Sequence, residues 1–217
     1  NMSNVYKNLG DLPLALEHLQ KSLRIDTELG NREGLAGTYN NIGNIHTELG
    51  DLPKALEHYQ RSAQLAEELN NDKGRAQALM NLGATHLEMG DRMRALEEFL
   101  KSLSLYRTMG RKLEMGMAFN NLGRTYARLE RKAEAHASLD SARTLFTELG
   151  SNRQLARNHY YRGDLLLEED KAREAIGECK LGLDIARQNN LPQQRKECSA
   201  CLMMAYERSG DLANAFR

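Results

Sequence analysis

The stretch from Asn81 to Phe99, NLGATHLEMGDRMRALEEF, decides how this chain folds. A Gly-Asp pair, Gly90-Asp91, divides the stretch into two segments, and the apolar residues that follow, from Leu96 onward, have helical spacing. Aspartate is a preferred residue just before a helix, because its side chain accepts a hydrogen bond from a free backbone N–H of the first turn. The stretch therefore indicates that one helix ends and a second begins within it.

The same pattern recurs every 40 residues along the chain. Gly-Asp pairs begin at Gly10, Gly50, Gly90 and Gly210, while the same slots hold Glu130-Arg131 and Asp170-Lys171. An alanine follows five residues after each slot: Ala15, Ala55, Ala95, Ala135, Ala175 and Ala215. A fixed period of this size is the signature of a repeat architecture, in which each unit packs against its neighbours.

Two further positions in each period hold small residues. One set is Ser22, Ser62, Ser102, Ala142 and Gly182, and the other is Gly43, Gly83, Gly123 and Gly163. A glycine inside a helix costs about 1 kcal/mol relative to alanine. Its recurrence at one register therefore indicates close contact between helices.

Each period reads as two helices with marked ends. Asp11 and Asp51 occupy the N-cap position, with prolines in the first turn that follows. Three glycines, Gly30, Gly110 and Gly150, stand just past an apolar run, where a helix is closed by a residue in the left-handed conformation. The turns are thus predicted from local residues alone.

These residues resemble a known family. The order and offsets of Asn81-Leu82-Gly83, His86, Gly90-Asp91, Ala95 and Phe99 are similar to the tetratricopeptide repeat signature, and Asn121-Leu122-Gly123 with Tyr126 matches it as well. The period of 40 is longer than the usual 34 of that family and resembles the repeats of kinesin light chains, Pins-type adaptors and bacterial sensor proteins.

The resemblance implies an all-α, right-handed superhelical solenoid of helix-turn-helix repeats. We expect one continuous array over residues 1–217, with repeat units near 1–29, 30–69, 70–109, 110–149, 150–189 and 190–217. Asn1 and Arg217 both fall inside helices of this register, so we expect the array to be a fragment of a longer protein.

Composition narrows the classes of function. Lys plus Arg and Asp plus Glu number 30 each, so no overall positive field draws the chain to nucleic acid or to an anionic membrane. The sequence has no run of 18 apolar residues. We therefore expect neither nucleic acid nor membrane as a partner.

The cysteines and histidines point to no cofactor. Cys179, Cys198 and Cys201 are an odd set without the spacing of a disulfide framework, and we expect reduced thiols in a cytoplasmic protein. Cys198 and Cys201 have metal-ligand spacing, but a zinc site needs four ligands and the last histidine, His159, lies far upstream. No motif of catalysis is present, so we expect neither an enzyme nor a metal site.

The family resemblance implies which residues face a ligand in the concave groove. The candidate peptide-binding residues are Asn40, Asn41, Asn44, Gln77, Asn81, Asn120, Asn121, Arg124, Arg157, Tyr160 and Tyr161. Side-chain amides both donate and accept hydrogen bonds, which suits contact with a peptide backbone. The alternative interpretation is that these asparagines, which include Asn1 in register, only connect one helix to another.

Arg124, Arg157 and the two tyrosines suggest an anchor for a partner that carries an acidic segment, because arginine binds carboxylates bidentately. Against this, Asp164 and Glu168 could neutralise the arginines from within the chain.

We predict that the chain is a scaffold that binds a partner peptide or protein in its groove. An alternative is a regulatory sensor segment of a larger signalling protein, with a kinase, cyclase or transcription regulator as effector, acting through a ligand or self-association.

Overall fold

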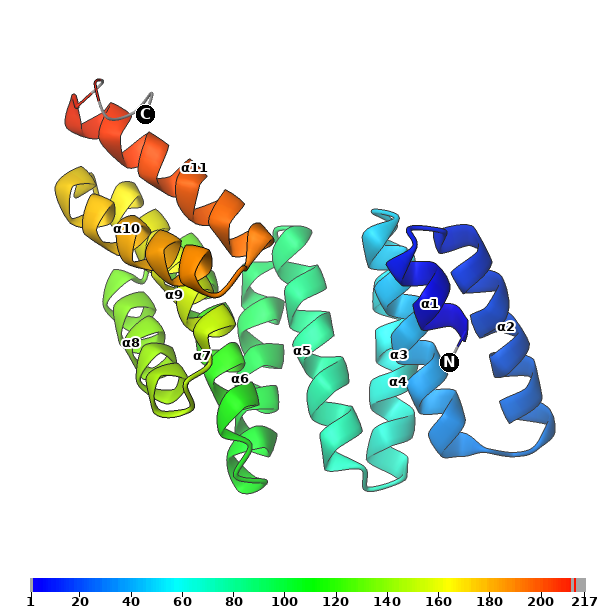
Figure 1. Cartoon of the computed structure of the whole chain (residues 1–217). Coiled ribbons are helices and arrows are strands. Elements are labelled where there is room, and N and C mark those ends of the chain that lie inside the picture. Colours follow the sequence, from blue (N-terminus) through cyan, green and yellow to red (C-terminus); the bar gives the residue numbers. More distant parts are fainter. Residues whose placement is uncertain (1, 212, 214–217) are drawn as a thin grey trace. The chain divides into compact units, whose positions relative to one another are not determined.

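The computed structural model describes residues 2–211 and 213, so Asn1, Ala215 and Arg217 of the predicted register lie outside the described residues. Within the described part the chain forms α-helices and no strand (Figure 1). The helices are α1 Met2–Asn8, α2 Leu12–Glu28, α3 Arg32–Glu48, α4 Leu52–Glu68, α5 Asp72–Glu88, α6 Arg92–Thr108, α7 Lys112–Arg128, α8 Lys132–Glu148, α9 Asn152–Glu168, α10 Ala172–Gln188 and α11 Pro192–Ser209. This confirms the predicted all-α fold of paired helices.

The predicted helix ends are confirmed. The Asp11 side chain accepts a hydrogen bond from the backbone N–H of Leu14 (3.1 Å), and Asp51 accepts one from Lys54 (3.3 Å). Gly30, Gly110 and Gly150 all have positive φ. Four residues other than glycine take the same conformation in other turns: Asn70, Glu130, Asp170 and Asn190. Glu130 and Asp170 stand at the Gly-Asp slot, so that turn keeps its conformation in the two copies without the pair.

Small residues lie where helices touch. A Cβ atom added at Gly83 would be 2.7 Å from a ring carbon of Phe99, and one added at Gly123 would be 2.6 Å from Leu139. The hydroxyl of Ser102 donates to the carbonyl of Ala76 at 2.8 Å. These contacts confirm that the recurring glycine and serine slots serve close packing, because a larger side chain would force the helices apart.

Contacts cluster in two compact units, Asn1–Met109 and Gly110–Arg217. The first unit contains α1 to α6 and the second α7 to α11, and in each unit consecutive helices pack together. The core of the first unit includes Ala55, Tyr59 and Leu82, and that of the second includes Leu139 and Leu165.

The expectation of three reduced thiols was wrong for two of them. Cys179 of α10 and Cys201 of α11 form a disulfide, with Cα atoms 5.8 Å apart, while Cys198 is a buried free cysteine. Packing of α10 against α11 brings the two residues together across 22 positions of sequence, which the spacing alone did not reveal. Cys179 lies in the core of the second unit, where it is fully buried.

Candidate functional site

In the first unit four of the five candidate amides form one connected network. Asn81 of α5 donates through Nδ2 to Oδ1 of Asn40 (2.9 Å) and to Oδ1 of Asn44 (3.4 Å), both on α3. Gln77 donates to Oδ1 of Asn81 at 3.4 Å. The amides of α3 and α5 thus hydrogen-bond between helices, as the alternative interpretation expected, and they lie on one shared surface.

Asn44 and Asn81 also line an open cavity of about 280 Å³ between α3 and α5. Its other lining residues are Lys7, Thr47, Glu48, Tyr59, Ala84, Thr85 and Glu88. We call it the α3–α5 pocket. The Tyr59 hydroxyl donates to Oδ1 of Asn44 (2.8 Å) and lies 3.1 Å from the Thr47 hydroxyl. Burial raises the pKa of Tyr59, so this phenol stays protonated.

Charged groups stand around this pocket. Lys7 of α1 forms an ion pair with Glu48 at 2.7 Å. Glu88, at the end of α5, is exposed, and it forms no ion pair among the described residues. The pocket therefore has a polar interior and one carboxylate beside it that is not neutralised.

Asn41 lies on the same helix but lines a different cavity. This cavity, of about 390 Å³, lies between α2 and α3 and is bordered by Asp26 and Glu33. Asn41 makes no hydrogen bond with another described side chain.

In the second unit the structure separates the candidate residues. Asn120 of α7 is only 3% exposed and accepts a hydrogen bond from Nδ2 of Asn158 at 2.7 Å. Asn158, which is fully buried, also donates to the carbonyl of Leu139 at 2.9 Å. Asn120 therefore connects α7 to α9 inside the core, whereas Asn121 is half-buried.

The arginine and tyrosine candidates come together only in part. The Arg124 guanidinium lies 4.9 Å from the centre of the Tyr161 ring, and Tyr160 packs against Tyr161 at 5.4 Å. Arg157 instead lies 4.0 Å from a carboxylate oxygen of Glu197. No carboxylate within the described residues forms an ion pair with Arg124.

These residues leave little space between α7 and α9. The cavity there is about 20 Å³ and is lined by Gly123, Arg124, Ala127, Arg128, Leu139, Tyr161, Asp164, Leu165 and Glu168. We call it the α7–α9 pocket. Arg128 and Glu168 form an ion pair at 3.0 Å beside it.

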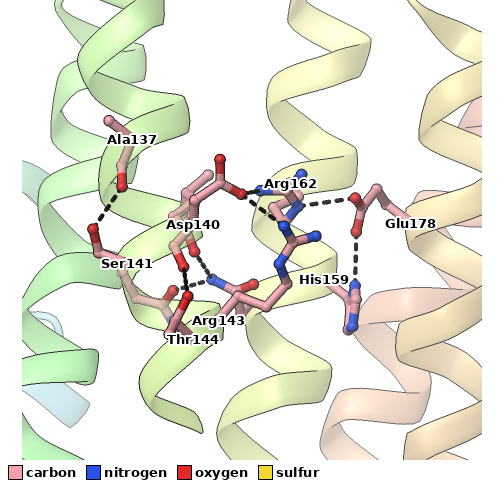
Figure 2. A network of polar contacts seen from close by, with 11 residues as sticks. Ala137, Asp140, Ser141, Arg143, Thr144, His159, Arg162 and Glu178 are labelled. Carbon is pink, nitrogen blue, oxygen red and sulfur yellow. Dashed lines mark hydrogen bonds and ion pairs between the residues drawn. The ribbon is translucent and has the colours of Figure 1, made fainter. Parts of the chain in front are cut away.

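A network of charged residues in the second unit was missed by sequence reasoning (Figure 2). Arg162 of α9 forms ion pairs with Asp140 of α8 and with Glu178 of α10, the latter at 2.9 Å. His159 lies 2.7 Å from the other oxygen of Glu178. The available signal was that Arg162 occupies the slot before the packing glycine that is apolar in the other copies: Ile42, Leu82, Leu122 and Leu202.

Glu178 titrates far from its ordinary range. Burial by itself would raise the pKa of Glu178, but hydrogen bonds from His159 and Arg162 and the charge of Arg162 outweigh it and lower the pKa to about 2. Glu178 is therefore ionised at neutral pH and joins α9 to α10, while Asp140 adds α8 to the same network.

Two of the histidines, His46 and His58, pack against each other as aromatic side chains. His46 is 8% exposed and stacks on His58 with ring centres 5.3 Å apart and planes 3° from parallel. Burial lowers the pKa of both imidazoles. Among the described residues no three His, Cys, Asp or Glu side chains are placed to hold a metal ion. No described helix is long and apolar enough to cross a membrane.

Comparison with known proteins agrees with this architecture. Residues 1–68, 34–108 and 74–148 match a family model described as tetratricopeptide repeat. No curated protein matches the chain by sequence.

Three solved structures illustrate the similarity of fold. BtubC from P. vanneervenii has 19% identity and a TM-score of 0.76, covering 94% of this chain and 86% of that one. The kinesin light chain-type repeats of Podosopora anserina have 13% identity and a TM-score of 0.72, covering 87% and 93%. A signal-transduction ATPase of Pyrococcus horikoshii with a tetratricopeptide repeat sensor has 16% identity and a TM-score of 0.79, covering 99% of this chain and 34% of that one.

Proposed function

This chain belongs to the tetratricopeptide repeat family, and on that premise we propose that it binds a partner peptide or protein along the faces that carry the candidate residues. The fold is typical of protein-interaction scaffolds, and we propose no catalytic step. One observation carries the proposal: the amides of Asn40, Asn44 and Asn81 lie on one surface of α3 and α5, beside an open polar cavity. A surface of amides and hydroxyls can exchange hydrogen bonds with an extended peptide backbone.

In the second unit we propose that Arg124 anchors an acidic group of the partner. The ring of Tyr161 holds its guanidinium at 4.9 Å, and no carboxylate of the described chain forms an ion pair with it. Arg157 contributes less in this proposal because Glu197 already lies 4.0 Å away. Asn120 is left out of the proposed contacts because it is buried.

Affinity capture from the native lysate tests binding. The wild-type chain is compared with a variant that combines Asn81→Ala, Asn121→Ala and Arg124→Ala, after thermal unfolding has shown that both are folded. A partner captured by the wild type and lost from the variant supports the proposal. Equal capture by both proteins contradicts it.

The acidic anchor has its own test. Arg124→Ala is expected to weaken binding of the captured partner by about tenfold, the effect of losing one charge-assisted hydrogen-bonded contact. Arg187→Ala, on the exposed side of α10, removes the same charge elsewhere and serves as the matched control. Equal affinity of the two variants would remove Arg124 from the proposal.

A second candidate function is a sensor segment within a larger signalling protein. The observation that favours it is the match of nearly the whole chain to 34% of an ATPase whose repeats are described as its sensor. Sequencing the gene around this segment distinguishes the two, since an adjoining effector domain favours the sensor and further repeats favour the scaffold.

A further inference from the structure

The two pockets described above occupy equivalent positions of the repeat. Each residue of the α7–α9 pocket lies 80 positions after its counterpart in or beside the α3–α5 pocket. Arg124 corresponds to Asn44, Tyr161 to Asn81, and Asp164 to Ala84. The first pocket, with smaller side chains at all three of these positions, is open at about 280 Å³, whereas the second retains about 20 Å³.

The charges of the two pockets differ in an informative way. In the second unit Glu168 is neutralised by Arg128 at 3.0 Å. In the first unit the counterparts of these residues are Glu88 and Glu48, so a carboxylate stands at the slot where the second unit has the arginine. Glu48 is paired with Lys7, and Glu88 has no ion-pair partner within the described residues.

We propose that the α3–α5 pocket receives the side chain of a basic residue, arginine or lysine, from the bound partner. The inference rests on the proposed function and specifies what this part of the surface selects. The basic side chain of the partner would neutralise Glu88 in the first unit, as Arg128 neutralises Glu168 in the second.

The interior of the pocket suits such a side chain. Thr47 and Tyr59 line it, and the hydroxyl of each retains capacity to accept a hydrogen bond from a guanidinium or ammonium group. Glu88 provides the opposite charge at the opening, where charge-assisted hydrogen bonds are the stronger kind.

Other occupants fit less well. Lys7 already neutralises Glu48, so an acidic side chain would meet the unpaired charge of Glu88, and an apolar one would remove water from the hydroxyls without replacing its hydrogen bonds. The amide of Asn44 is already engaged through its oxygen by Tyr59 and Asn81, so it holds the floor in place.

The test uses the full chain and a defined probe. N-acetyl-arginine amide is titrated into ¹⁵N-labelled protein, and the side-chain amide signals of Asn44 and Asn81 are followed by NMR. The neutral probe N-acetyl-citrulline amide has nearly the same shape without the charge. Three variants are compared: Ala84→Leu, which fills the pocket, Glu88→Gln, which removes the charge, and Glu97→Gln on α6, which removes an equal charge outside the pocket.

With the arginine probe we expect saturable shifts of these two amide signals in the wild type and no saturation in Ala84→Leu. The affinity for the probe should be about threefold weaker in Glu88→Gln, as for a partly exposed charge contact, and unchanged in Glu97→Gln. Equal binding of the citrulline probe overturns the proposal. So does saturation that persists in Ala84→Leu, or the absence of any saturable shift in the wild type.

A displayed random peptide library, selected on the wild type and on Ala84→Leu, separates this inference from the proposed function. Enrichment of peptides with arginine or lysine on the wild type alone supports both. Enrichment of the same peptides on both proteins, without basic residues, overturns the basic pocket and leaves peptide binding standing. If no peptide is enriched although the arginine probe saturates, peptide binding fails and the selectivity of the pocket stands.

Discussion

The α3–α5 and α7–α9 pockets are formed by equivalent helices of the repeat but are lined by different side chains. Both lie between the first helices of successive helix pairs. The helix that separates these two in sequence, α4 or α8, contributes Tyr59 or Leu139 to the floor of the pocket. In one pocket asparagine, alanine and threonine leave space, while in the other tyrosine, arginine and leucine fill it. The comparison teaches that the repeat register positions a pocket, whereas side-chain volume and charge at a few slots decide whether a ligand can enter.

The two units differ in the same way at a second register position. Glu98 of α6 and Glu178 of α10 are 80 residues apart and occupy equivalent slots. Burial raises the pKa of Glu98, which has one buried oxygen without a partner. The pKa of Glu178 is lowered to about 2, because Arg162 and His159 hold its carboxylate. The glutamate at this slot is therefore destabilised in its ionised form in the first unit and stabilised in its ionised form in the second.

The largest expected effect is that of Glu178→Gln. Its pKa difference from the ordinary value corresponds to about 3 kcal/mol of unfolding free energy at neutral pH, at about 1.4 kcal/mol per pKa unit. Because the folded-state pKa is lowered, this stability is present above the unfolded pKa near 4.5 and is lost as the pH falls toward 2. Urea unfolding of the wild type and the variant across this range should show the difference shrink as the pH falls. A difference that does not change with pH would show that ionisation of Glu178 is not the cause.

Asn158→Ala should have the second largest effect, a loss of about 2 kcal/mol of unfolding free energy. The substitution leaves the Leu139 carbonyl and the Asn120 side-chain oxygen without these hydrogen bonds inside the second unit. Asn81→Ala breaks the comparable link of the first unit, but Asn81 is only half-buried, so a loss of about 1 kcal/mol is expected there. Urea midpoints of the two variants measure the order. The reverse order would mean that burial does not distinguish the two amide pairs.

Tyr161→Asn should give the α7–α9 pocket the residue that Asn81 provides in the other. It removes the ring beneath Arg124 and against Tyr160, and we expect the protein to lose about 1 kcal/mol of unfolding free energy. Tyr161→Phe keeps the ring and is the control, with an unfolding midpoint close to that of the wild type. Equal losses in both variants would assign the effect to the hydroxyl rather than to filled volume.

Glu98→Gln should have the smallest effect, and of the opposite sign. Because the folded-state pKa of Glu98 is raised, the wild type loses stability as the pH rises above the ordinary value of 4.5. The variant carries no charge to desolvate, so its urea midpoint at neutral pH should be higher than that of the wild type. At about pH 4 the two midpoints should converge. A lower midpoint at neutral pH would show that the Lys101 contact, at 3.9 Å, outweighs the burial of the carboxylate.

The helices, their ends and the close contacts between them could be predicted from the amino-acid sequence. Asp11 and Asp51 cap helices through neighbouring N–H groups, and Gly83 meets Phe99 because the spacing of the repeat brings them together. Such features depend on local backbone rules and on a register that is written again in each copy. The candidate surface on α3 and α5 could be predicted for the same reason.

Which side chains pair and which spaces stay open depends instead on how the helices pack in three dimensions. Cys179 joins Cys201, Asn120 turns inward to Asn158, and Arg162 finds Asp140 and Glu178 on two neighbouring helices. Each of these outcomes depends on the direction and volume of side chains from different helices, which no single period of the sequence contains. For that reason equivalent slots became an open polar pocket in one unit and a filled one in the other.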